Sequence, residues 1–277
     1  MPSLPTNNGH LPVCYAYDYT DGTWKGIDGT AQPLLNRGFL YGDGYFDTMA
    51  VFAGEIQLFD LHRVKCEAAA FALRFPFDGQ AFQALHALVG EEGVLRFYAY
   101  MPGGVGQTTL FDQAELRAVF TPQPLTATIP SHSVTLAEER VYSQGLPYRH
   151  KTLSRLPYVH AQRLLTGTTF TDALLLNEQG RVASLTSSCI VYGLLGQAYA
   201  IPSSEGCMAG AARAAFLQLT GAEERPLSLE KLPTLSWMFG LNSLGPRQIA
   251  HYNDQPLGEL DAETLQTLYQ IYPFLKR

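Results

Sequence analysis

Residues 151–159 read KTLSRLPYV, and this stretch decides how the rest of the chain is interpreted. It begins just past residues 121–132, TPQPLTATIPSH, where three prolines and no apolar periodicity predict an extended connection. Connections of this composition commonly separate two domains. The sequence therefore predicts a small N-terminal domain over 1–121, a linker over 122–132 and a large domain over 133–277.

Both predicted domains mix strand and helix patterns. Over 13–51, short aromatic and β-branched segments alternate with Asp-Gly and Gly-Asp turns, which is typical of strands joined by tight turns. Over 63–73, an alanine-rich run indicates a helix. Further strands are expected over 94–100, 116–120, 134–141, 173–176 and 189–192, and further helices after Lys151 and over 211–219. The predicted fold class is α+β.

The composition excludes several classes of partner. Of 277 residues, 46% are hydrophobic and 16% are charged, which is typical of globular proteins. The 19 basic and 25 acidic residues give a net charge of -6 without long runs of one sign. Neither nucleic acid nor a membrane surface is therefore expected as a partner, and a small molecule is.

The cysteines and the N-terminal residues indicate the compartment. Cys14, Cys66, Cys189 and Cys207 lie far apart, with no C-x-x-C pair and no histidine at ligand spacing, so no metal site is expected. The first thirty residues lack the pattern of a signal peptide, and no stretch approaches the length of a membrane span. These features predict a cytoplasmic protein.

Several segments resemble, in this order, the fold-type IV pyridoxal-phosphate enzymes, namely branched-chain and D-amino-acid aminotransferases and 4-amino-4-deoxychorismate lyases. They are RGFLYGDGYFDT (37–48), the H-x-x-K segment within 58–70, KTLSRLPYV (151–159), the stretch 172–213 and the F-x-x-N-S-L match at 239–244. The resemblance implies a small N-terminal α/β domain and a larger C-terminal domain with a barrel-like β core. It also implies pyridoxal 5'-phosphate as cofactor and a homodimer.

Lys151 is the residue that the resemblance assigns to the cofactor. KTLSRLPYV is similar to the family's K-x-L-N-R-L-x-x-V stretch, whose lysine attaches the cofactor covalently. An amine must be neutral to form that bond, and burial or a nearby cation favours neutrality by lowering its pKa. Arg155, expected one helical turn beyond Lys151, would supply such a cation. Once the substrate displaces the lysine, the freed amine can move a proton.

The resemblance also implies which groups bind the cofactor phosphate. Lys65 stands where the family has an arginine, so it would offer charge without the two-pronged guanidinium. Gly210, Ala211 and Ala212 match a glycine followed by the first turn of a helix, whose free N–H groups favour an anion. Ala212 replaces a family threonine and offers only its backbone, and Ser243 would add a hydroxyl.

Ser184 is the main departure from the family pattern. It stands where the family has a glutamate that keeps the pyridine nitrogen protonated, which makes the ring a strong electron acceptor. A serine can donate a hydrogen bond to that nitrogen but cannot hold it protonated. Three interpretations stay open: an enzyme with weaker carbanion stabilisation, a different partner for the nitrogen, or a chain that binds cofactor without turnover. Thr186 and Ser187 would orient the ring.

The substrate side is less well defined. Phe46 stands where D-amino-acid aminotransferases have tyrosine, and Asn242 is a second candidate for contacting the substrate. No R-x-H pair follows Tyr100 to bind an α-carboxylate, and residues 102–106 form a predicted loop there. Arg155 and the 242–244 match favour a lyase that eliminates pyruvate. Transamination of a branched-chain or D-amino acid, and a catalytically degenerate binding or scaffold protein, are the alternatives.

Overall fold

The computed structural model describes residues 14–27, 36–103 and 113–276, which fold as two β-sheets with helices packed against them. The first sheet has six antiparallel strands in the order β2-β1-β6-β5-β3-β4. Its strands are β1 (Tyr15–Thr20), β2 (Thr23–Ile27), β3 (Gly44–Phe52), β4 (Glu55–Ile56), β5 (Gly93–Tyr100) and β6 (Glu115–Pro122). The helices of this part are α1 (Arg37–Tyr41), α2 (Phe59–Leu73), α3 (Gly79–Gln83) and the 3-10 helix η1 (Ala84–Leu88).

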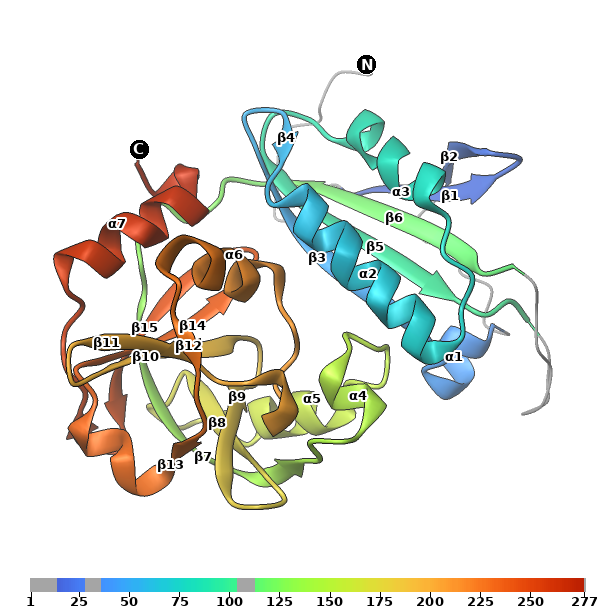
Figure 1. The fold of residues 1–277 in the computed structure, drawn as a ribbon. Helices are drawn as coiled ribbons and strands as arrows, with labels where there is room; N and C mark the ends of the chain where they lie inside the picture. Colours follow the sequence, from blue (N-terminus) through green and yellow to red (C-terminus); the bar gives the residue numbers. More distant parts are fainter. Residues whose placement is uncertain (1–13, 28–35, 104–112, 277) are drawn as a thin grey trace.

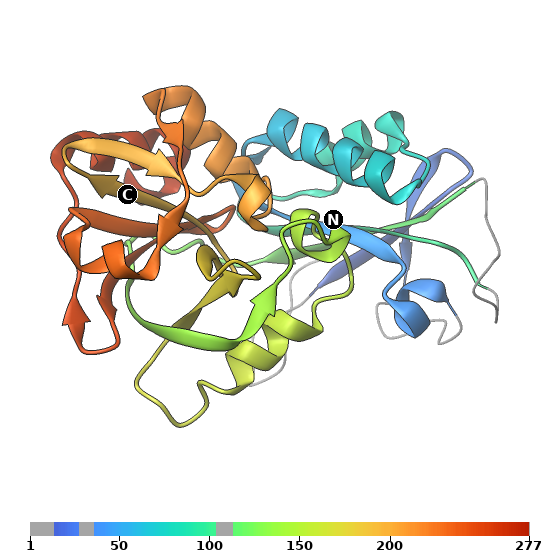
Figure 2. The same ribbon diagram turned by 60° about the horizontal axis from the view of Figure 1, so that its bottom comes forward.

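Helices α2 and α3 cover one face of the first sheet (Figures 1 and 2). Successive side chains on a strand point to opposite faces, so alternate residues of β3 have different surroundings. Tyr45 and Met49 pack in the core under the two helices. Phe46 and Thr48 point the other way, toward the second part of the chain, where they line a cavity. This second face therefore contributes to the site.

The second sheet is mixed, with the strand order β12-β11-β10-β14-β15-β7-β8-β9-β13, and β16 pairs with β15. Its strands are β7 (Ser131–Val141), β8 (Asp172–Asn177), β9 (Arg181–Leu185), β10 (Cys189–Leu194), β11 (Gln197–Ala200), β12 (Glu223–Glu224), β13 (Leu227–Ser228), β14 (Trp237–Asn242), β15 (Gly245–Tyr252) and β16 (Gln255–Pro256). The helices are α4 (Leu146–Arg149), α5 (Leu156–Arg163), α6 (Ala211–Thr220), α7 (Ala262–Ile271), and the 3-10 helices η2 (Ser203–Glu205), η3 (Leu229–Thr234) and η4 (Pro273–Lys276).

Residues 37–41 form a helix where the sequence analysis expected strands and tight turns, so that expectation was wrong. The Asn36 side chain accepts a hydrogen bond from the backbone N–H of Phe39 at 2.8 Å and caps the start of α1. Gly42 ends the helix in the left-handed conformation, with φ 64°, which glycine adopts at no steric cost. The composition of the segment is strand-like, but these two caps decide its local structure.

The segment 151–153 joins the two sheets. The backbone N–H of Phe46 donates to the carbonyl of Lys151 at 2.9 Å, and the N–H of Leu153 donates to the carbonyl of Gly44 at 2.9 Å. The start of KTLSRLPYV is therefore extended and pairs with β3. Helix α5 begins only at Leu156, with Arg155 as its N-cap residue. The expectation that Arg155 lies one helical turn beyond Lys151 was wrong.

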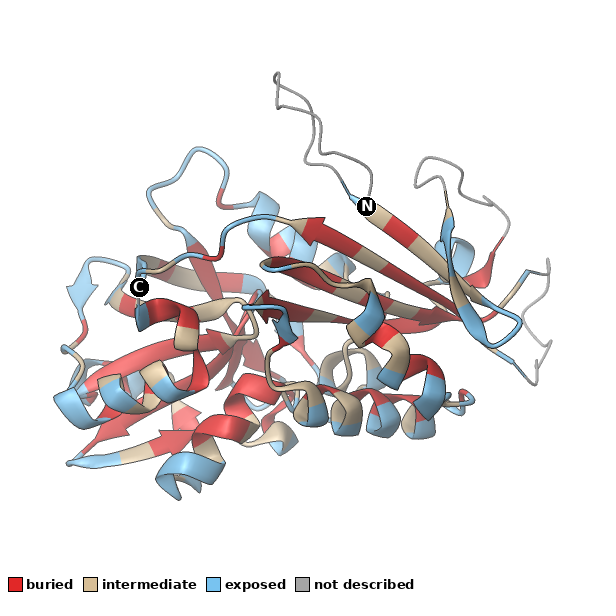
Figure 3. Ribbon diagram, turned by 90° about the horizontal axis from the view of Figure 1, so that it is seen from above, coloured by how far each residue is buried: buried red, intermediate tan, exposed pale blue. Residues whose placement is uncertain are grey.

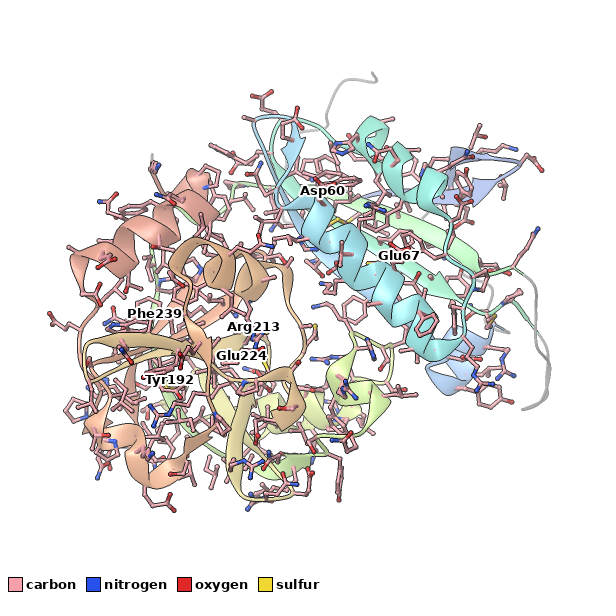
Figure 4. All side chains as sticks on the ribbon, viewed as in Figure 1. Asp60, Glu67, Tyr192, Arg213, Glu224 and Phe239 are labelled. Carbon is pink, nitrogen blue, oxygen red and sulfur yellow. The ribbon has the colours of Figure 1, made fainter. Side chains whose placement is uncertain are left out.

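Buried residues lie mainly within the two sheets and on the helix faces that pack against them (Figure 3). Figure 4 shows Arg213 of α6 beside Glu224 of β12, with which it forms an ion pair. Asp60 and Glu67 are exposed on α2, on the side that faces solvent. Among the residues that the structure describes, no helix has the length and hydropathy needed to cross a membrane.

Candidate active site

A cavity of about 350 Å³ is lined by residues of both sheets. All twelve residues that the sequence analysis selected line it: Lys151, Lys65, Arg155, Ser184, Thr186, Ser187, Gly210, Ala211, Ala212, Ser243, Phe46 and Asn242. The structure thus brings the separate matching segments to one place. Of the predicted loop at 102–106, residues 104–106 lie outside the described part of the chain.

The Lys151 amine is held in this wall beside an aromatic ring. Its Nζ lies 4.8 Å from the centroid of the Phe46 ring. Burial lowers the pKa of Lys151 to about 8, and the positive charges of Lys65 and Arg155 act in the same direction, whereas Asp47 opposes them. A lysine with a pKa near 8 is partly neutral at neutral pH, and the neutral amine is the nucleophile.

Lys65 is already paired with a buried acid that the sequence analysis missed. Its Nζ donates to Asp47 at 2.5 Å, and Asp47 also accepts from the ring nitrogen Nδ1 of His62 at 2.7 Å and from the backbone N–H of Thr48. Burial alone would raise the pKa of Asp47, but the charges of Lys65 and His62 hold it well below its usual range. The sequence did contain a sign of this role, because Asp47 is an acid inside the otherwise mostly apolar strand β3.

The start of α6 provides unused backbone donors. Gly210 precedes the helix with φ -71° and ψ 145°, and no side chain caps the first turn. The leading N–H groups of a helix have no partner within it, and the helix dipole favours an anion there. An added Cβ at Gly210 would lie 3.0 Å from the Cys189 sulfur, so the backbone approaches β10 closely. The N–H of Gly210 itself donates to the Met208 carbonyl at 2.9 Å, so Ala211 and Ala212 present the free N–H groups that suit an anion in the cavity wall.

Ser184 and Thr186 differ in whether their hydroxyls are free. The buried Ser184 Oγ has no hydrogen-bond partner among the described residues. The Thr186 hydroxyl lies 2.5 Å from a carboxylate oxygen of Asp172 and 2.7 Å from Oε1 of Gln162. Ser184 is therefore available to a bound molecule, whereas Thr186 already has protein partners.

Ser187 and Asn242 belong to a polar network with an arginine that the sequence analysis did not select. Arg247 donates through Nη1 to the hydroxyls of Ser187 and Ser188, at 2.8 and 2.9 Å. Asn242 donates to the Ser188 hydroxyl and accepts from the N–H of Leu244 in the turn after β14, where Ser243 also lies. Arg96 of β5 lines the same cavity and was missed as well.

The lining of the cavity carries a strong excess of positive charge. None of the described residues that line it is Asp or Glu, whereas five are cations: Lys65, Arg96, Lys151, Arg155 and Arg247. The Nη1 atom of Arg155 is buried and has no hydrogen-bond partner within the described part of the chain. Such a cavity suits an anionic molecule that offers several acceptors.

The sequence pattern of the family described as amino-transferase class IV matches residues 44–252. The chain belongs to the class IV aminotransferase family. Members of this family use pyridoxal phosphate, which confirms the expected cofactor at the level of the family. The cavity of this class IV aminotransferase fits that molecule: the start of α6 suits its phosphate, the Lys151 amine suits its aldehyde, and the unpaired Ser184 hydroxyl suits its ring nitrogen. The individual roles of the twelve residues stay predictions.

Three known proteins are similar to this class IV aminotransferase. It is 28% identical to the aminodeoxychorismate lyase of Vibrio harveyi over 176 residues, which are 58% of this chain and 63% of that relative. The match therefore spans less than two thirds of the relative's length. The structure of 4-amino-4-deoxychorismate lyase from Pseudomonas aeruginosa has a TM-score of 0.78 at 23% identity and covers 96% of this chain and 100% of that one. The branched-chain aminotransferase of Thermoproteus uzoniensis has a TM-score of 0.81 at 16% identity and covers 95% of each chain. These two structures confirm the expected fold.

Proposed function

We propose that this class IV aminotransferase is a pyridoxal-phosphate enzyme that eliminates pyruvate from an amino-substituted carboxylate, in the manner of an aminodeoxychorismate lyase. The observation that carries the proposal is the Lys151 amine, whose pKa burial lowers to about 8, in a cavity lined by five cations and the start of α6. The likeness to the Vibrio harveyi lyase supports elimination over transamination.

The cofactor, when bound, supplies an aldehyde that bonds to amines and a ring that accepts electrons from the carbon bearing the amino group. Lys151 would hold the aldehyde end. The backbone N–H groups of Ala211 and Ala212 would bind the phosphate, with the Ser243 hydroxyl beside them. The Ser184 hydroxyl would donate to the ring nitrogen, which gives this buried and unpaired group a partner.

Lys151 would also move the protons. When the amino group of the substrate takes its place, the neutral Nζ would accept the proton from the carbon that bears that amino group. The bond between the neighbouring carbon and the ether oxygen would then break, and the same amine would give the proton to the departing enolpyruvate, which leaves as pyruvate. A pKa near 8 suits both steps, because the amine can accept and release a proton near neutral pH. The positive charge of Arg155, which lines the same cavity, contributes to the lowered pKa of Lys151.

The first experiment measures the absorbance of the purified protein with added pyridoxal phosphate. The wild type is expected to show the near-visible band of the lysine-bound cofactor, and Lys151→Ala is expected to abolish it. Lys231→Ala is the matched control, because Lys231 is exposed on η3 and does not line the cavity. Absence of the band in the wild type contradicts the proposed function.

The second experiment identifies the products. Release of pyruvate from aminodeoxychorismate without an amino acceptor supports elimination. Transfer of the amino group to a keto acid instead supports transamination, the activity named for the Thermoproteus uzoniensis protein. A cofactor band with neither product identifies the catalytically degenerate alternative that the serine at position 184 raises.

We also propose that the protein acts as a homodimer in the cytoplasm. Two exposed apolar side chains support a contact between copies: Phe39 on α1 and Leu156 on α5 are each 69% exposed. The two helices belong to one surface, because Gly42 at the end of α1 lies against Ser154 just before α5. No disulfide links the described cysteines, which suits a reducing compartment. Sedimentation velocity of the wild type and of Phe39→Ser tests the dimer.

A further inference from the structure

We propose that Arg96 and Arg247 bind carboxylate groups of the substrate, so that the substrate is an amino acid with a second carboxylate remote from its reacting amino group. The inference rests on the proposed function and adds to it the residues that select the substrate. The two arginines come from different sheets, Arg96 from β5 and Arg247 from β15, and line the same cavity.

Arg96 is an unpaired cation in the cavity wall. It is half-buried, and within the described residues no hydrogen-bond or ion-pair partner is found for its guanidinium. In the register of the sheet it lies opposite Thr48, on the face that also carries Phe46. Phe46 is the ring beside which the Lys151 amine lies, at 4.8 Å from its centroid. Thr48 and Phe46 are two residues apart, about 7 Å along the strand, so Arg96 lies on the same face of the sheet as the ring beside the Lys151 amine.

Arg247 is fixed in place without losing its charge. Both hydrogen bonds of its Nη1 go to neutral hydroxyls, those of Ser187 and Ser188. Asn242 in turn donates to the Ser188 hydroxyl and to the Ser187 carbonyl. A guanidinium that is held by neutral groups keeps its full attraction for a carboxylate and has already lost its rotational freedom. This is the arrangement expected of a residue that selects a ligand.

Neither arginine belongs to the group of donors proposed for the phosphate. Arg247 pairs with Gly240, whereas the next residue of β14, Leu241, points to the other face and belongs to the same hydrophobic cluster as Ala212 of α6. The start of α6 and the Arg247 side chain therefore lie on opposite faces of β14. In the first sheet, Arg96 likewise lies on the face away from Asp47 and its partner Lys65.

The charges in the cavity lead to the same substrate class. Of the five lining cations, Lys65 is paired with Asp47, and Lys151 would hold the cofactor. Arg155 stacks on the Tyr158 ring and donates to the carbonyl of Thr186. The phosphate, with about two negative charges, takes the start of α6. Arg96 and Arg247 remain for the substrate, from two sides of the cavity. An amino acid with a single carboxylate satisfies only one of them, and a dicarboxylate satisfies both.

The test compares two unreactive acids of equal length, glutarate with two carboxylates and pentanoate with one. Isothermal titration calorimetry measures the binding of each to the full chain with added pyridoxal phosphate. Glutarate is expected to bind at least about tenfold more tightly than pentanoate, because a second charge-assisted contact contributes that much or more. Arg96→Met and Arg247→Met are each expected to remove about tenfold of the glutarate affinity and to change pentanoate binding less than about threefold.

Arg140→Met is the matched control, because Arg140 is exposed on β7 of the second sheet and does not line the cavity. Arg96→Lys and Arg247→Lys, which keep the charge, are expected to recover part of the glutarate affinity and guard against a folding defect in the methionine variants. Equal binding of the two acids, or a loss in only one of the two arginine variants, overturns the proposal. The absorbance band of the cofactor bound to Lys151 is measured on the same samples. Absence of that band contradicts the proposed function, whereas a normal band with equal binding of the two acids contradicts only the present inference.

Discussion

Replacing Lys65 by methionine tests how the cavity prepares the Lys151 amine. After burial, the positive charge of Lys65 is the largest cause of the lowered pKa of Lys151. Lys65 is itself held by Asp47, with 2.5 Å between Nζ and the carboxylate oxygen. Methionine keeps much of the apolar stem and removes the charge. The pKa of Lys151 is expected to rise, and Asp47, released from Lys65, adds to the rise because its charge also favours the protonated amine.

The size of the effect follows from the pKa of about 8. At pH 7.5 about a quarter of such an amine is neutral, against about one part in a thousand for an ordinary lysine. A unit charge several ångströms away contributes about 1 to 3 kcal/mol at an effective dielectric constant of about 20. Loss of Lys65 should therefore raise the pKa of Lys151 by about one to two; the first unit lowers the neutral fraction at pH 7.5 about eightfold and the second about tenfold.

The assay is the rate at which the cofactor-free protein captures pyridoxal phosphate, followed by absorbance between pH 6.5 and 10. The midpoint of the pH profile should move upward by about one or more in Lys65→Met. In Asp47→Asn it should move downward, because the carboxylate that favours protonated Lys151 is lost while Lys65 stays. Arg63→Met is the control on the same helix, since Arg63 pairs with Glu67 away from the cavity, and it should leave the midpoint unchanged.

One result would refute this reasoning. If Lys65→Met slows capture or weakens binding equally at every pH and leaves the midpoint in place, Lys65 acts on the phosphate, as the sequence analysis expected. The electrostatic account of Lys151 would then be wrong. A changed midpoint with unchanged affinity at high pH would instead show that Lys65 positions and tunes the lysine and does not bind the phosphate.

Three further predictions concern stability and cofactor binding. Lys151→Met should stabilise the cofactor-free protein at pH 7 by about 3 kcal/mol in urea unfolding, because the fall of the pKa of Lys151 from 10.5 to about 8 disfavours the protonated folded state. That advantage should shrink as the pH rises from 8 to 10.5, where the wild-type amine loses its proton, and an advantage independent of pH would contradict the cause given. Ser184→Ala should weaken cofactor binding about three- to tenfold in a fluorescence titration without lowering the Tm of the cofactor-free protein, since no hydrogen bond to a described residue is lost; an equal loss of Tm would mean that the hydroxyl is structural. Gly42→Ala should cost about 1 to 2 kcal/mol or more, because φ is 64° and the new Cβ would lie 2.5 Å from the Ser154 hydroxyl. Adding Ser154→Gly should relieve the contact but not the backbone strain, and full recovery in the double variant would show that the strain is negligible.

The sequence predicted the contents of the cavity better than its local geometry. Lys151 and Gly210 could be selected because each lies in a stretch where several residues match a family pattern at fixed spacing. Helix α6 begins at Ala211, as expected, since a glycine and an alanine-rich run mark its start. The start of α5 was misjudged although a signal was present. A helix from Lys151 would have placed Pro157 in its interior, whereas the observed start at Leu156 places Pro157 in the first turn.

Other features depend on pairings that a single sequence does not reveal. Arg96 faces the cavity because β3 and β5 pair with Thr48 opposite it, and a register shifted by one residue would turn it toward α2. Asp47 is tolerated in a buried position only because His62 and Lys65, on a helix 15 and 18 residues later, reach it. Long-range partners of this kind decide whether a charged residue belongs to a site, to the core or to the surface.

The serine at position 184 is easier to understand in this setting. A glutamate there would be an acid in a cavity whose described lining contains five cations and no other acid. Such surroundings favour an unprotonated ring nitrogen, to which a serine hydroxyl can donate a hydrogen bond without adding charge. On the proposed function, the same cations would stabilise negative charge that develops on the substrate during proton removal, because fixed charges in a cavity act without reorganisation. Arg155, whose Nη1 is buried and unpaired among the described residues, lies in that wall with Lys151. On the proposed function, the arginines of the cavity would therefore supply charge stabilisation that the family obtains from one glutamate and the ring, and the loss of the glutamate does not by itself imply the loss of catalysis.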